Sequence, residues 1–181
     1  MPFIEGVGDL LTQPLYDELP VLAAGTTQLV YFSQPVGQAG KTILNTNMQL
    51  AGQVQAGYKM NVLALAISFR LGTLRSNIVT CLDTAFGQFN IASKWWWQSP
   101  LRFLPGGVGL AYFSNEAAAA ALQAASNGVA DPRAIYTLRQ PIAITQTESF
   151  NFTVAYAAAV APTVDTQMTV ALHGELTRTV Q

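Results

Sequence analysis

Charged side chains are scarce in this sequence. The 181 residues include nine Lys or Arg and ten Asp or Glu, together 10% of the chain, whereas an ordinary soluble domain carries about 25%. The net charge of −1 provides no positive field that would attract nucleic acid. Half of the residues are hydrophobic, which is enough for one folded domain. We therefore expect a protein that is either poorly soluble alone or largely covered by partners.

Cysteine and histidine occur once each, as Cys81 and His173. A single cysteine excludes a disulfide framework, and the two residues are too few for a Cys/His zinc site. His173 lies two residues before Glu175, and no serine stands in a G-x-S-x-G turn, which is the usual setting of a nucleophilic serine. We therefore predict no enzyme activity, no metal and no cofactor, and we expect Cys81 to be a small buried hydrophobic residue.

Long hydrophobic runs are also absent. No stretch of 18 apolar residues occurs, so we expect no membrane-spanning helix and no membrane partner. The first residues, MPFIEGVGDLL, are acidic and lack the basic start of a secretory signal.

Most of the chain after residue 25 alternates apolar and polar side chains with the period of a β-strand. Turns rich in glycine and proline separate these segments, which is typical of an antiparallel sandwich or barrel of about eight strands. One short helix is expected among them, because the alanine-rich run Ala117–Ala125 follows a capping Ser114 or Asn115 and ends at Asn127. The expected strands are 26–33, 42–50, 58–69, 78–82, 86–91, 108–113, 136–144, 150–156 and 168–176.

Residues 1–25 have no sustained period, and we predict an extended N-terminal arm over 1–25 in front of a domain over 26–181. The arm is acidic, whereas residues 41–102 hold six basic residues against Asp83 alone, a net of +5. Such an arm either lies on its own domain or reaches a neighbouring subunit. In the second case its deletion would leave the domain folded. The candidate interface residues of the arm are Glu5, Asp9, Asp17 and Glu18.

Three consecutive tryptophans, Trp95, Trp96 and Trp97, follow Lys94. In a regular strand Trp95 and Trp97 would face one side and Trp96 the other, so at least one ring is expected away from the core. An exposed tryptophan serves as an anchor in protein interfaces or as a platform for a sugar ring. We take the three residues as candidate interface residues, with glycan binding and simple core or edge packing as the alternatives.

Two C-terminal segments resemble jelly-roll virion proteins of tailed bacteriophages. In the segment YTLRQPIAITQTESFNFTV (136–154), a Pro-Ile-x-Ile strand turns at Glu148-Ser149 and continues into an F-x-F strand. The segment MTVALHGELTRTVQ (168–181) contains the L-x-G-x-x-x-R pattern from Leu172 to Arg178, which closes the domain in that family. The resemblance implies an all-β antiparallel jelly-roll sandwich of about eight strands with one short alanine-rich helix and an N-terminal arm.

The same resemblance implies a role in the virion. Proteins of this kind decorate or cement the head shell as trimers or other symmetric oligomers, so the expected partners are the major capsid protein or neighbouring virion proteins. The expected location is the virion, assembled in the host cytoplasm, with no direct contact to nucleic acid. Two alternatives remain open: a jelly-roll major capsid protein that builds the shell itself, and a glycan-binding virion module. A virion-borne hydrolase ranks last, because no pair of carboxylates stands in a recognisable motif.

Overall fold

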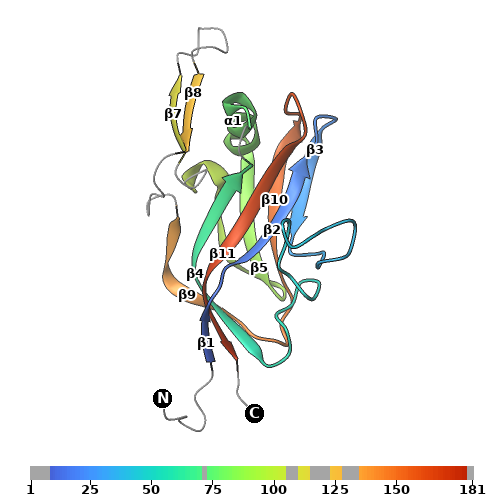
Figure 1. Cartoon of the computed structure of the whole chain (residues 1–181), viewed down its shortest axis with the longest axis vertical. Coiled ribbons are helices and arrows are strands. Elements are labelled where there is room, and N and C mark those ends of the chain that lie inside the picture. Colours follow the sequence, from blue (N-terminus) through green and yellow to red (C-terminus); the bar gives the residue numbers. More distant parts are fainter. Residues whose placement is uncertain (1–8, 71–72, 105–109, 115–122, 128–134, 179–181) are drawn as a thin grey trace.

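Two antiparallel sheets, stacked as an all-β sandwich, form the body of the protein (Figure 1). The computed structural model describes residues 9–70, 73–104, 110–114, 123–127 and 135–178. The first sheet contains β1 (Asp9–Thr12), β2 (Leu15–Val21), β4 (Tyr58–Phe69), β9 (Tyr136–Ile144) and β11 (Thr166–Arg178). The second sheet contains β3 (Thr26–Tyr31), β5 (Ala85–Ile91), β6 (Lys94–Pro100) and β10 (Phe150–Val160).

The strands pair in a regular order that runs from the ends of the chain towards its middle. The first sheet has the order β2, β11, β4, β9, and the second has the order β3, β10, β5, β6. Besides β1 and the separate antiparallel pair of β7 (Leu110–Ser114) and β8 (Gln123–Asn127), eight strands remain. Among these eight, the first pairs with the last, the second with the seventh, the third with the sixth and the fourth with the fifth. The chain is thus arranged like one long hairpin rolled up across two sheets.

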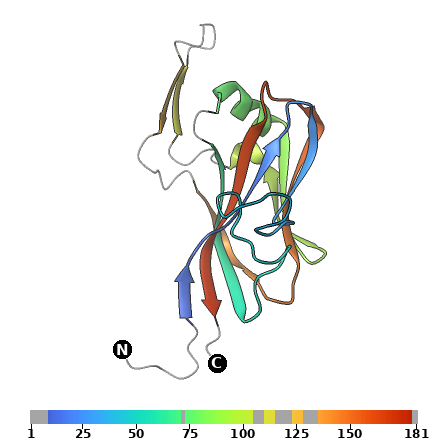
Figure 2. The ribbon, with the colours of Figure 1, turned by 45° about the vertical axis from the view of Figure 1, so that its right-hand side comes forward.

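Residues 9–21 belong to the first sheet rather than to a separate arm. β2 pairs with Thr166–Leu172 of β11, and β1 pairs with the end of the same strand (Figure 2). The side chains of Leu15 and Val21 are buried in the core. From Asp9 onward, the segment expected to be an arm is therefore part of the sandwich.

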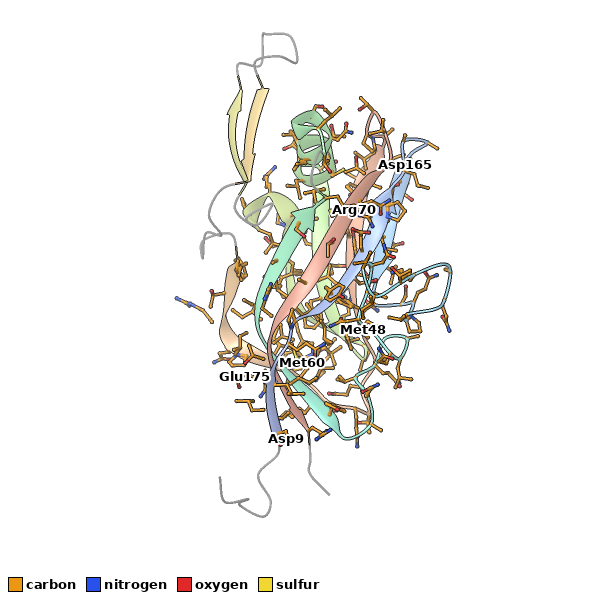
Figure 3. The ribbon with its side chains drawn as sticks, viewed as in Figure 1. Asp9, Met48, Met60, Arg70, Asp165 and Glu175 are labelled. Carbon is orange, nitrogen blue, oxygen red and sulfur yellow. The ribbon has the colours of Figure 1, made fainter. Side chains whose placement is uncertain are left out.

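The core lies between the two sheets and is built by alternation. Phe150, Phe152, Val154 and Tyr156 on β10 are all buried, as their spacing predicts. Full burial of a large apolar side chain contributes about 1.5–3 kcal/mol. The rings also contact one another, since those of Tyr31 and Phe152 meet edge to face with centroids 6.5 Å apart. Figure 3 shows the side chains of the described residues on both sheets.

The connection between β3 and β4 covers the free edge of β2. The strand expected over 42–50 is wrong, because this segment consists of turns with isolated bridges only. Its backbone still pairs with β2, since the N–H of Glu18 donates to the carbonyl of Asn45 at 2.8 Å. Met48 and Val54 are buried against the core. A covered edge cannot pair with another chain.

Two local predictions are wrong. Residues 78–82 lie in α1 (Arg75–Asp83) instead of a strand. Asn77, Ile78 and Cys81 are buried, and their spacing places them on one face of a helix.

The alanine-rich helix is contradicted over 123–125, which lie in β8 (Gln123–Asn127) paired with β7 (Leu110–Ser114); residues 117–122 lie outside the described residues. A helix of this length is marginal without packing, so propensity alone does not decide the structure.

Candidate functional site

Asp17 is buried inside the chain, in spite of its expected place at an interface. Its side chain has no exposed surface. One carboxylate oxygen pairs with the ammonium of Lys41, and the other accepts the N–H of Phe32 at 2.6 Å. Burial raises the pKa of Asp17, while the hydrogen bonds from Lys41 and Phe32 act in the opposite direction. The expectation for Asp17 is corrected: its charge fastens the β3–β4 connection to β2.

Glu18 and Asp9 also find partners within the chain. Arg70 holds Glu18 with two hydrogen bonds, from Nε to Oε2 at 2.9 Å and from Nη2 to Oε1 at 2.5 Å. Because Glu18 is only 6% exposed, its place at an outward-facing interface is corrected as well. Asp9 is exposed and pairs with Arg178 at 2.6 Å, far from Arg70 along the first sheet (Figure 3). Glu5 lies outside the described residues.

The tryptophan cluster lies on β6, at the edge of the second sheet. Trp95 and Trp96 keep 69% and 52% of their surface exposed, whereas Trp97 packs against the core. Phe89 pairs with Trp97 and Asn90 pairs with Trp95, so Trp96 is the extra residue of a β-bulge. The expectation that Trp95 and Trp97 share a face is wrong, because the bulge between them shifts the alternation.

Trp97 joins the two sheets at their open side. Its ring stacks on Phe152 of the second sheet with centroids 5.8 Å apart. The same ring meets Tyr136 of the first sheet edge to face at 5.9 Å. Gly87 leaves room for this arrangement, since a Cβ there would lie 3.2 Å from the Trp97 ring and 2.6 Å from Leu101 of the short 3-10 helix η1 (Leu101–Phe103).

β9 forms the corresponding edge of the first sheet, and it is bulged too. Its ladder with β4 runs from Ile144 to Ile142 and resumes only at Thr137, so the intervening residues 138–141 have no partner on β4. Arg139, Gln140 and Pro141 are exposed as a result. Proline has no N–H to donate, so it is tolerated at an edge or a bulge but not in a central strand.

A groove of about 440 Å³ lies between these two bulged edges. Trp96 and Trp97 line it from β6, and Tyr136 and Leu138–Ile142 line it from β9. Within the described part of the chain, β6 pairs with β5 alone and β9 with β4 alone. The groove therefore combines aromatic side chains with the unpaired backbone of two edge strands.

Arg139 is the one charged side chain that lines the groove, and the nearby sequence adds cations only. Residues 94–104 and 135–144 contain Lys94, Arg102 and Arg139, all exposed, and no Asp or Glu. The guanidinium of Arg102 lies 5.5 Å from the ring centroid of the exposed Phe103, which keeps this cation beside an apolar surface. A ligand with negative charge is therefore favoured here over a positive one.

The reactive side chains lie apart from the groove. Cys81 is buried in α1, and burial raises the pKa of its thiol to about 11, so it stays protonated at neutral pH. His173 is half-buried on β11, and burial lowers its pKa. Within the described ranges, no group of three or more His, Cys, Asp or Glu is placed to hold a metal ion. The groove therefore offers a ligand aromatic rings, the guanidinium of Arg139, the side-chain amide of Gln140 and unpaired backbone groups of the two edge strands.

Arg139, Gln140 and Pro141 were not identified from the sequence as site residues. The available signal was Pro141, since a proline inside an alternating strand indicates an edge or a bulge. Gln140 was a second signal, because it interrupts the apolar face formed by Tyr136, Leu138 and Ile142. That β9 lies opposite β6 could not be predicted, because it depends on long-range pairing.

No protein-family model matches the chain, and neither the curated proteins nor the solved structures contain a match to it. None of the helices in the described ranges has the length and apolar character needed to cross a membrane. The similarity to phage virion proteins therefore stays a prediction.

Proposed function

We propose that the sandwich is a jelly roll. Eight of its strands pair first with last and inwards to the fourth with the fifth, which is the arrangement expected of a rolled hairpin in two sheets. The two C-terminal segments that resemble phage proteins coincide with β9, β10 and β11. An experimental structure with a different strand order would contradict this assignment.

We propose further that the protein is a structural component of a bacteriophage virion, a capsid decoration or cement protein. The observation that carries this proposal is the edge at β6, where Trp95 and Trp96 are exposed and the outer side of the strand pairs with no other described strand. Exposed tryptophans at an edge strand resemble the anchors that dominate protein interfaces. The scarcity of charge is consistent with a surface that partners cover in an assembly.

In this role the sandwich is a rigid body that bridges capsid subunits. The partners are the major capsid protein or other virion proteins, and several copies, most simply a trimer, bind together. Each copy contributes a modest interface, and linked copies reach a much higher combined affinity than one copy alone. Bridging of this kind stabilises the shell against internal pressure.

Light scattering after size-exclusion chromatography of the purified protein tests the proposal. A trimer or another small closed oligomer is the expected result. Large uniform particles would show instead that the chain is a major capsid protein that builds the shell. A monomer at the highest soluble concentration would contradict both roles and favour a glycan-binding module.

A further inference from the structure

We propose that the groove between β6 and β9 binds an extended, acidic peptide segment of a neighbouring protein, whose backbone pairs with the edge of β6. The proposal deepens the structural role above and rests on it only for the identity of the neighbour. The binding itself is a property of this chain and can be measured without a virion.

The backbone of β6 provides the first argument. β6 hydrogen-bonds to β5 on one side, and no described strand pairs with its other side. An edge of this kind is a template for a further strand. The β3–β4 connection covers the edge of β2 through the bond from Glu18 to Asn45, and Pro141 and the unpaired residues 138–141 interrupt β9. β3 is the other edge of the second sheet, but it carries no tryptophan. β6 is thus the edge best suited to accept a strand.

The side chains of the groove provide the second argument. An extended segment directs alternate side chains to opposite sides, so every second residue of a peptide on β6 would point towards the groove. There it would meet the rings of Trp96, Trp97 and Tyr136 and the ring of Pro141. The bulge at Trp96 matters here, because it releases this ring from the regular alternation of the strand.

The charge around the groove decides the chemistry of the segment. Arg139 lines the groove. Lys94, on the strand of the tryptophans, and Arg102, just after it, are also exposed, and residues 94–104 and 135–144 contain no Asp or Glu. A segment with Asp or Glu at its ends would be attracted, and one with Lys or Arg repelled. A glycan is less well matched, because the lining residues include no carboxylate and only one carboxamide, Gln140, to bond the many hydroxyl groups of a sugar.

Fluorescence anisotropy with labelled decapeptides tests this site on the full chain. The probe has alternating Val and Thr in the middle and two Glu at each end, and the matched probe has Lys in place of Glu. We expect the acidic probe to bind at least about ten-fold more tightly than the basic one. N-methylation of alternate central amides should abolish binding, because it removes the donors that pair with β6.

Variants of the chain locate the binding. Arg139→Glu should reverse the preference between the two probes, whereas Lys59→Glu, which changes an exposed cation on β4, should not. Trp96→Ala should weaken binding by at least about ten-fold, whereas Leu44→Ala, which removes an exposed apolar side chain of the β3–β4 connection outside the groove, should have little effect. Circular dichroism of each variant confirms that it is folded.

Equal binding of both probes, no binding of either, or insensitivity to Trp96→Ala would overturn the proposal. Binding of chito-oligosaccharide or dextran that Trp96→Ala abolishes would overturn it in favour of a glycan site. The proposed function fails separately: peptide binding by a chain that never joins a virus particle would retain the site and remove the virion role. Binding to virus particles without peptide binding would retain the virion role and remove the proposed peptide site.

Discussion

At the scale of residues, the buried pair of Asp17 and Lys41 is a sensitive point of the fold. Asp17→Asn leaves the ammonium of Lys41 buried without a counter-charge, because Lys41 is only 8% exposed. Removing one partner of a buried pair costs about 3–5 kcal/mol of unfolding free energy. Urea denaturation should show this loss. Asp9→Asn, which breaks the exposed pair with Arg178, is the control and should change the midpoint little. Equal effects of the two substitutions would contradict the assigned role of Asp17.

His173 gives a pH dependence that can be isolated, because it is the single histidine of the chain. Burial lowers its pKa below the ordinary 6.5, so the unfolded chain takes up a proton more readily than the native protein. Its contribution to stability is therefore present above about pH 6.5 and is lost as the pH falls through the lowered native pKa. His173→Gln should lose less stability than the parent between pH 7 and pH 5 in thermal melts. Parallel profiles for the two proteins would contradict this prediction.

At the scale of elements, the bulge between β4 and β11 depends on a glycine. A Cβ at Gly174 would lie 1.9 Å from the carbonyl oxygen of Asn61, a backbone atom that cannot move aside. At Gly87 a Cβ would instead meet the flexible side chain of Leu101 at 2.6 Å. Gly174→Ala should therefore prevent folding, whereas Gly87→Ala should cost about 1–3 kcal/mol by overpacking. Soluble expression and urea unfolding distinguish the two. A stable Gly174→Ala protein would show that β4 and β11 do not approach as described.

The N-terminal strands allow a second prediction at this scale. Deletion of residues 1–25 removes β1 and β2, which pair with β11 over most of its length. It also uncovers the edge of β11 and removes the buried Leu15 and Val21. We therefore expect the truncated chain to be insoluble or unfolded, contrary to the expectation from the sequence that the remaining domain folds alone. Hydrogen exchange of the truncated protein would contradict this if β4 and β11 stayed protected.

Alternation over long segments predicted most strands correctly. The limits expected for β4, residues 58–69, agree with the structure, because a long segment that is mostly apolar leaves few alternatives. Short segments were less reliable. The five residues 78–82 fit a strand or a helix equally well. They form part of α1, where Ile78 and Cys81 are buried in the core. Residues 42–50 alternate as a strand would, but side-chain hydrogen bonds hold them as a loop; for example, the N–H of Tyr16 donates to Oδ1 of Asn47.

The candidate site could be predicted only in part. The tryptophans stand out in the sequence as a cluster, and two of the three rings are exposed. Which two could not be known, because it depends on a bulge whose position is set by pairing with β5. The acidic residues were a poor guide, since the basic partners Lys41 and Arg70 follow Asp17 and Glu18 by 24 and 52 positions. Long-range pairs of this kind leave no local pattern.

At the scale of the whole molecule, the protein combines a well-packed interior with a surface poor in charge. The pair of Asp17 and Lys41 is buried and fastens the β3–β4 connection to β2, and Glu18 is buried against the half-exposed Arg70. These contacts remove three charges from the surface. The free edge at β6, with its exposed aromatic rings, is left as the place where another chain fits best. This distribution is the basis of our proposal that the protein belongs to an assembly.

The most direct test of this assignment is density-gradient sedimentation of virus particles from cultures that carry this chain, followed by quantitative mass spectrometry of each fraction. The account predicts that the protein sediments with the shell protein at a fixed copy ratio and is released only when the particles are disrupted. If the protein instead remains at the top of the gradient with unassembled proteins while intact particles band without it, the virion role is wrong.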